Sequence, residues 1–146
     1  GALYTEDFRR ICQQVGFSDP RILTVSEIKV EDAELKRILG NAKFYSITYR
    51  LFKNSQLEDK CEDFGQVAIY DGSIKEHPDY YDLDDHHRFV TNKPMLVCGN
   101  TACMVGESWL KPHFKIIGDT STHYGLFDCS PVNVTSNADN VGGACC

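Results

Sequence analysis

The strongest constraint on the fold is a regular alternation of side chains between Lys43 and Lys53. Successive side chains of a β-strand point to opposite faces, so this run divides into two sets. One face carries Tyr45, Ile47, Tyr49 and Leu51, and the other carries Phe44, Ser46, Thr48, Arg50 and Phe52. The first set is apolar throughout and the second is mixed. The pattern therefore predicts a strand in a sheet with one well-buried face.

Two helices and another strand are predicted before this one. Thr5 is a suitable N-cap for a first helix that ends at Gly16, and its apolar stripe consists of Phe8, Ile11, Cys12 and Val15. The β-branched residues of 21–26 predict a strand, and the pattern of 31–39 predicts a short helix. The order helix, strand, short helix, strand in residues 1–54 indicates an α/β fold.

The charge is distributed unevenly along the chain. Residues 1–54 hold nine Lys and Arg against seven Asp and Glu, whereas residues 55–146 hold six against fourteen. The change falls in the polar stretch 55–65, which is predicted to connect two domains. The net charge of −6 argues against a nucleic-acid partner, because phosphate binding needs clustered Lys and Arg. No apolar run reaches the length of a membrane span, so no membrane partner is expected.

Residues 66–130 are expected to form a small α+β domain. Its predicted elements are a strand at 66–70, a hairpin of 88–91 with 94–98, a helix at 101–110, and final strands at 113–117 and 125–129. The acidic segment 76–85 is predicted to be an exposed loop. The polar segment 131–146 is predicted to be a flexible tail that contains cysteines.

Seven cysteines, an odd number, match no secreted disulfide scaffold, so reduced thiols and a cytoplasmic location are expected. The neighbours Cys145 and Cys146 form a soft chelating pair, suited to Cu(I), Zn(II) or trivalent arsenic, and they are the candidate metal ligands. The competing interpretation of this pair is idle thiols on an exposed tail.

The other polar and sulfur-containing residues suggest no site on their own. Small buried hydrophobic positions explain Cys12, Cys98 and Cys103. Carboxylates beside Cys61 are expected to raise its pKa and lower its reactivity. The segment 82–87, Asp-Leu-Asp-Asp-His-His, lacks the spacing of an EF-hand or an H-E-x-x-H helix, so it is interpreted as a solvated acidic loop. The residues therefore assemble no catalytic centre by themselves.

Several segments together resemble arsenite methyltransferases that use S-adenosylmethionine. They are Gly-Ala-Leu-Tyr at 1–4, Gly-Phe at 16–17, the strand at 44–53, and the segments 66–72, 123–127 and 142–146, the last of which reads Gly-Gly-Ala-Cys-Cys. The resemblance covers nearly the whole chain and is strongest in residues 1–72.

The resemblance implies the end of a class I, Rossmann-like methyltransferase sheet in residues 1–54, followed by a small α+β C-terminal domain. Enzymes of this family transfer the methyl group of S-adenosylmethionine to trivalent arsenic held by thiolates. The family's Gly-rich cofactor turn and its arsenic-binding cysteines precede the Gly-Ala-Leu-Tyr segment, so the resemblance assigns no catalytic and no cofactor-binding residue in this chain. We therefore expect the chain to begin partway through a catalytic domain, to be inactive alone, and to partner the upstream methyltransferase domain.

Two alternatives remain open: a thiol-rich module that binds As(III), and a non-catalytic interaction domain. Under the leading interpretation, the stripe of the first helix and the apolar face of 43–53 pack on upstream elements. Without those elements, residues 1–54 are expected to expose a large hydrophobic patch and to dimerise or be partly disordered.

Overall fold

The computed structural model describes residues 2–129. In chain order the elements are α1 (Thr5–Gln14), β1 (Arg21–Ile28), α2 (Ala33–Leu39), β2 (Phe44–Arg50), β3 (Glu62–Asp63), β4 (Gln66–Tyr70), β5 (Tyr80–Asp82), β6 (Arg88–Val90), β7 (Met95–Val97), α3 (Gly99–Gly106), the 3-10 turn η1 (Lys111–His113), β8 (Phe114–Ile117) and β9 (Gly125–Leu126). Every strand pair among these residues is antiparallel.

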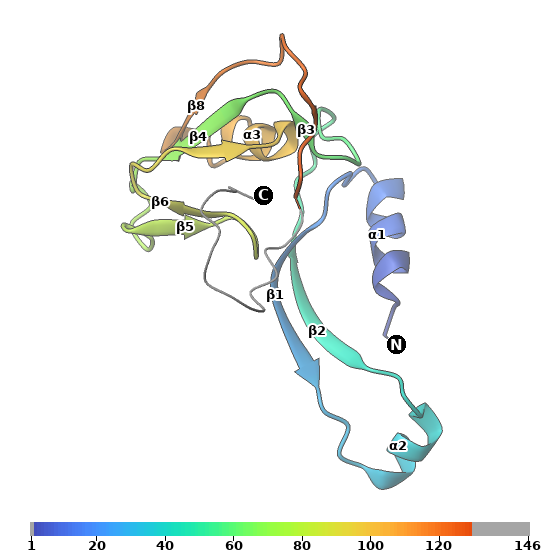
Figure 1. Ribbon diagram of the computed structural model, residues 1–146. Helices are drawn as coiled ribbons and strands as arrows, with labels where there is room; N and C mark the ends of the chain where they lie inside the picture. Colours follow the sequence, from blue (N-terminus) through green and yellow to red (C-terminus); the bar gives the residue numbers. More distant parts are fainter. Residues whose placement is uncertain (1, 130–146) are drawn as a thin grey trace, which may run out of the picture.

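A long antiparallel pair, β1 with β2, extends away from the rest of the chain and carries α2 at its far end (Figure 1). We call β1, α2 and β2 the arm. The Asp32 side chain caps α2 by accepting a hydrogen bond from the Leu35 amide at 2.8 Å. Gly40, with φ +58°, ends the helix. The predicted order strand, helix, strand is confirmed, with a first strand that continues to Ile28 rather than ending at residue 26.

The first helix, α1, lies beside the arm and contacts it through aromatic rings (Figure 1). The ring centroids of Phe8 and Tyr49 are 4.4 Å apart. The helix is confirmed, but its predicted cap was wrong. Tyr4 occupies the N-cap position without a side-chain hydrogen bond, and Thr5 is the first helical residue. Gly16 follows the helix with φ +92°, a conformation that glycine adopts without strain.

The arm and α1 leave an extensive apolar surface exposed, as predicted for residues 1–54. We call this set the open apolar surface; its members are Leu3, Tyr4, Ile11, Val15, Val25, Ile28, Leu35, Ile38, Tyr45 and Leu51. The prediction of a well-buried face on β2 was wrong, since none of its residues is buried. The reason is that the sheet has two strands within the described residues and its contact with α1, through Phe8 and Tyr49, leaves the residues of β2 half-buried or exposed.

We call residues 66–117 the body. Most residues of the main core lie in the body. A three-stranded sheet with the order β7-β4-β8 contacts α3, and the β5–β6 pair lies beside it (Figure 1). The core consists of Phe52, Leu57, Ala68, Tyr70, Tyr81, Leu83, Phe89, Val97, Ala102, Met104, Val105 and Leu110. Aromatic rings pack edge to face within it, with the Phe89 and Phe114 centroids 5.0 Å apart. The predicted strand at 66–70 is confirmed as β4.

Two predictions for the body were wrong because pairing is decided by tertiary contacts. Residues 88–91 and 94–98 do not pair with each other: β6 pairs with β5, and β7 pairs with β4. The segment 76–85 is not an exposed loop, since it contains β5 and the buried residues Tyr81, Leu83 and Asp84.

The helix α3 occupies residues 99–106 instead of the predicted 101–110. It starts earlier because Cys98 acts as the N-cap, with its sulfur accepting a hydrogen bond from the Thr101 amide. It ends earlier because the Ser108 hydroxyl donates to the Met104 carbonyl and accepts from the Leu110 amide. These bonds replace the next helical turn.

The stretch 55–65 is partly structured. It contains β3, which pairs with β9, and Leu57 is part of the core. Phe52 from the end of the arm also belongs to this core. The described residues thus form a small α/β fold with small antiparallel sheets, and no Rossmann-like sheet lies within them. The domain boundaries at 54 and 65 stay predictions, and the predicted tail 131–146 lies outside the described residues.

Candidate functional site

Three cysteines distant in the sequence meet at one place in the structure. The sulfur atoms of Cys61, Cys98 and Cys129 all lie within 4.8 Å of one another. We call these residues the thiol cluster. Cysteine sulfur is the ligand that thiophilic ions select, so three converging sulfurs are a candidate binding site. The sequence interpretation missed it, because the three positions share no short spacing motif.

Backbone pairing brings the cluster together. Cys61 directly precedes β3, and its carbonyl accepts a hydrogen bond of 2.9 Å from the Phe127 amide, which extends the β3–β9 pair. Cys129 follows two residues later, in the irregular segment after β9. Cys98 joins β7 to α3 and is fully buried, whereas the other two cysteines are partly exposed.

Two groups that favour negative charge lie beside the Cys98 sulfur. The sulfur accepts from the Thr101 amide at the start of α3, and the Arg21 guanidinium lies 3.8 Å from it. Helix N-termini and guanidinium groups both favour negative charge on a nearby sulfur. Hydrogen bonds to Cys129 and Cys98, followed by burial, raise the pKa of Cys61. The pKa was expected to rise, but the neighbouring carboxylates named in the sequence analysis are not the cause.

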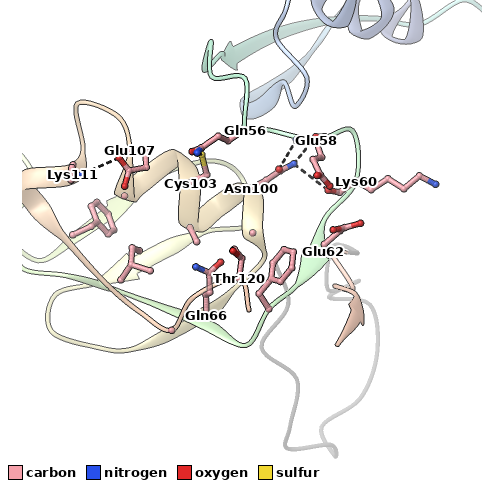
Figure 2. Close-up of a pocket in the computed structure, with 17 residues that line it drawn as sticks. Gln56, Glu58, Lys60, Glu62, Gln66, Asn100, Cys103, Glu107, Lys111 and Thr120 are labelled. Carbon is pink, nitrogen blue, oxygen red and sulfur yellow. Dashed lines mark hydrogen bonds and ion pairs between the residues drawn. The ribbon is translucent and has the colours of Figure 1, made fainter. Parts of the chain in front are cut away.

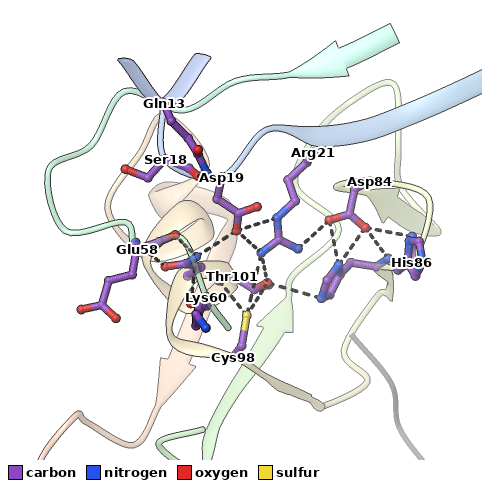
Figure 3. A network of polar contacts seen from close by, with 12 residues as sticks. Gln13, Ser18, Asp19, Arg21, Glu58, Lys60, Asp84, His86, Cys98 and Thr101 are labelled. Carbon is purple, nitrogen blue, oxygen red and sulfur yellow. Dashed lines mark hydrogen bonds and ion pairs between the residues drawn. The ribbon is translucent and has the colours of Figure 1, made fainter. Parts of the chain in front are cut away.

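A buried polar network borders the thiol cluster (Figure 3). Arg21, at the base of β1, donates to Asp19 at 2.7 Å, to Asp84 at 3.1 Å and to the Thr101 hydroxyl at 3.3 Å. Only 8% of Arg21 is exposed. Burial alone would lower its pKa, but the charges of Asp19, Cys98 and Asp84 raise it, so the guanidinium stays protonated.

The Asp84 carboxylate accepts hydrogen bonds from several neighbouring groups. It accepts from the His87 ring at 2.7 Å and from the His86 and His87 amides at 2.9 and 2.8 Å. Burial by itself would raise the pKa of Asp84; the His87 contact and Arg21 outweigh burial and lower it to about 2. The interpretation of 82–87 as a solvated loop was therefore wrong, because Asp84 and His87 are buried anchors.

Asp84, Asp85 and His86 also offer ligand atoms within 4.8 Å of one another. Arg21 and His87 already pair with Asp84, and the His86 ring contacts Asp85 directly. An acidic group whose members are already paired gives no metal assignment.

A groove of about 620 Å³ runs along α3 (Figure 2). Cys103 lines this groove and is not a member of the thiol cluster. Burial, followed by the charge of Glu107, raises the pKa of Cys103. Gln66 also lines the groove, and its buried Oε1 atom accepts no hydrogen bond within the described residues. The lining mixes charged and apolar side chains and contains no pair of nucleophile and base.

The structure does not test every predicted site residue. Cys145 and Cys146 lie outside the described residues, and Cys12 is buried as predicted.

A doubly wound sheet binds a cofactor such as S-adenosylmethionine at the carboxyl ends of parallel strands. All strand pairs in residues 2–129 are antiparallel, so the described residues contain no parallel sheet of this kind. None of the helices in this range is long and apolar enough to traverse a bilayer.

Comparison with known proteins identifies relatives along most of the chain. A family model for the arsenite methyltransferase C-terminal domain matches residues 59–141. An arsenite methyltransferase from Aquipseudomonas alcaligenes is 48% identical over 128 residues, which are 88% of this chain and 37% of that protein. The Mus musculus arsenite methyltransferase is 35% identical over 116 residues, which are 78% of this chain and 30% of that protein. The chain thus spans about a third of the length of these relatives.

A solved structure agrees with this assignment. CrArsM, an arsenic(III) S-adenosylmethionine methyltransferase from Chlamydomonas reinhardtii, has a TM-score of 0.84 and 65% sequence identity to this chain. The match covers 87% of this chain and 42% of that one. The resemblance noted from the sequence is confirmed. The chain belongs to the arsenite methyltransferase family and contains its C-terminal domain.

Proposed function

We propose that this chain is the C-terminal part of an enzyme that transfers methyl groups from S-adenosylmethionine to trivalent arsenic. The observation that carries the proposal is the 65% identity to CrArsM over 87% of the chain, together with a TM-score of 0.84. Within that enzyme, an upstream methyltransferase domain binds the cofactor and holds the arsenic as a thiol complex. We also propose a cytoplasmic location for this enzyme, which the reduced thiols expected from its cysteines support.

The open apolar surface supports a role in packing against that upstream domain. Ile38 on α2 and Val15 at the end of α1 are 64% and 54% exposed, and covering such aliphatic side chains with another domain would be favourable. Strands β1 and β2 form an antiparallel pair with an unpartnered edge on each side, within the described residues. Addition to the edge of a larger sheet would satisfy those backbone groups and cover the apolar side chains.

A chimera tests the proposal. The C-terminal portion of CrArsM is replaced by this chain, and the product is supplied with arsenite, a thiol and labelled S-adenosylmethionine. Methylated arsenic is the expected product from the chimera, and none is expected from residues 1–146 alone. Methylation by residues 1–146 alone would contradict the proposed need for an upstream domain, and a folded but inactive chimera would contradict the proposed function.

A matched pair of substitutions on α1 tests the packing role. Val15→Asp places a charge in the open apolar surface, whereas Gln14→Asp places the same charge on a neighbouring exposed polar position. A charge desolvated at an interface without a partner is strongly unfavourable. We expect Val15→Asp to lower the chimera's activity or thermal stability more than Gln14→Asp. Equal effects would contradict packing of this surface.

A further inference from the structure

We propose that Cys61, Cys98 and Cys129 form a three-sulfur site for trivalent arsenic within the C-terminal domain. This site is distinct from the cysteines that the family resemblance places upstream of residue 1. The choice of arsenic as the ligand rests on the proposed function, whereas the existence of a site rests on the convergence of the three sulfurs.

The spacing of the sulfurs suits one shared ion. A thiolate ligand lies ~2.3 Å from a bound zinc ion, so two sulfurs on one ion are about 3.8 Å apart at a tetrahedral angle. The sulfurs of the thiol cluster are all within 4.8 Å of one another. Closing onto an ion of similar size therefore requires a movement of at most about 1 Å, which rotation about one side-chain bond supplies.

The number of ligands favours arsenic over zinc. Structural zinc sites are almost always four-coordinate. Among the described residues, the cluster has three members and no fourth His, Cys, Asp or Glu. Arg21 and Thr101 border Cys98, but a guanidinium has no lone pair to offer an ion. The His87 Nε2 atom lies 3.3 Å from the Thr101 hydroxyl, which separates it from the sulfurs. Trivalent arsenic needs three ligands, because a lone pair occupies its fourth position.

The charge balance also favours arsenic. Arsenous acid, As(OH)₃, reacts with three thiols to form three As–S bonds, and each hydroxide leaves as water with one thiol proton. Arsenic stays trivalent and the product is neutral, so no oxidant or reductant is consumed. Three thiolates on Zn(II) would instead carry one negative charge next to fully buried Cys98. Arg21 lies 3.8 Å from the Cys98 sulfur but already pairs with Asp19 and Asp84, so its single positive charge would be shared among three negative groups.

An arsenical in solution can reach the thiol cluster through its two partly exposed members. Cys61 and Cys129 are partly exposed, so they are the first thiols that an arsenical meets, and buried Cys98 completes the site. Binding would join three segments: the connector before β3, the start of α3, and the irregular segment that follows β9. A ligand that binds only the folded arrangement of these segments stabilises the fold.

Titration of the full chain with arsenite under a non-thiol reductant tests the proposal. The readouts are arsenic bound per chain, the number of As–S bonds from X-ray absorption, and the melting temperature. The background carries Cys145→Ser and Cys146→Ser, so the adjacent tail thiols do not contribute. We expect one arsenic per chain with three sulfur ligands and a higher melting temperature. Cys61→Ser and Cys129→Ser should each weaken binding by about 100-fold, since an intramolecular thiol acts at a high effective concentration.

Cys103→Ser is the matched control, because Cys103 is also partly buried but lines the groove rather than the cluster. It should leave arsenite affinity unchanged. Circular dichroism establishes that each variant is folded, and Cys61 and Cys129 are chosen because they are less buried than Cys98. Arsenic held by two sulfurs, equal affinity in Cys61→Ser and Cys103→Ser, or tighter binding of Zn²⁺ than of arsenite would overturn the proposal. These outcomes are independent of the chimera, which reports on methylation.

Discussion

Replacement of Arg21 by methionine is the most informative test of how the arm is attached to the body. Arg21 is 8% exposed and donates to Asp19, Asp84 and Thr101, which come from three different segments. Methionine fills a similar volume but supplies no donor and no charge. The loss leaves the Asp84 carboxylate, 5% exposed, without its guanidinium partner. Removing one member of a buried ion pair costs about 3–5 kcal/mol.

This cost is large enough to measure by denaturation. With an m-value of about 2 kcal/mol/M in urea, the midpoint should fall by about 2 M. The assay is urea unfolding followed by circular dichroism and by fluorescence of Trp109, the chain's single tryptophan. The matched control is Arg88→Met, whose partner Asp82 lies at the surface, so its midpoint should change much less.

A double-mutant cycle with Asp84→Asn identifies the cause of the loss. If Arg21 acts mainly through the Asp84 charge, the two substitutions together should cost clearly less than the sum of the two alone. The reasoning would be refuted by additive effects, or by an Arg21→Met midpoint shift no larger than that of Arg88→Met.

Three further predictions concern stability. The folded-state pKa of Asp84 is lowered to about 2, so its ionised form stabilises the protein by about 2 kcal/mol above pH ~4. This contribution is lost as the pH falls toward 2. The difference between the urea midpoints at pH 7 and pH 2.5 should therefore be smaller in Asp84→Asn than in the parent. Tyr70→Phe removes a buried hydroxyl that donates to the His77 carbonyl at 2.7 Å, and it should lower the free energy of unfolding by about 1–3 kcal/mol, whereas Tyr80→Phe, at an exposed position, should have little effect by the same assay. Gly72→Ala places a Cβ atom 2.7 Å from a Thr91 methyl group at φ +79°, so its melting temperature should fall further than that of Gly40→Ala, where φ is +58° but no atom lies within 4 Å; equal shifts would exclude the steric contribution.

Local sequence patterns predicted the elements whose residues interact with near neighbours. The alternation of 43–53 predicted β2, and the strand predicted at 66–70 and the short helix predicted at 31–39 correspond to β4 and α2. The turn at 91–94 is also present, with Asn92 at φ +60°. The strand after that turn pairs with β4 rather than with β6, because burial of Val97 in the core decides its partner. Such a choice depends on contacts between distant segments.

The thiol cluster also depends on contacts between distant segments, which local sequence patterns did not predict. The sequence interpretation of Cys98 as a small buried residue is correct about its burial and incomplete about its surroundings. Its sulfur meets Cys61 and Cys129 because β3 pairs with β9, and each of those strands is two residues long. Strands this short carry no detectable alternation. The one signal in the sequence was the number of cysteines, seven in 146 residues.

The base of the arm explains why two arginines occupy positions that look unfavourable in the sequence. Arg21 lies opposite Arg50 in the β1–β2 register, and like charges at opposed positions repel each other. The repulsion is relieved because each guanidinium has its own acceptors, at least one of which lies in the body. Arg21 binds the carboxylates of Asp19 and Asp84, and Arg50 donates to the carbonyls of Asp82 and Leu83 at 2.9 and 2.6 Å. Both strands of the arm are therefore held at the end where they meet the body, next to the thiol cluster. The far end of the arm makes no such contacts within the described residues and carries much of the open apolar surface, as a segment that packs against another domain would.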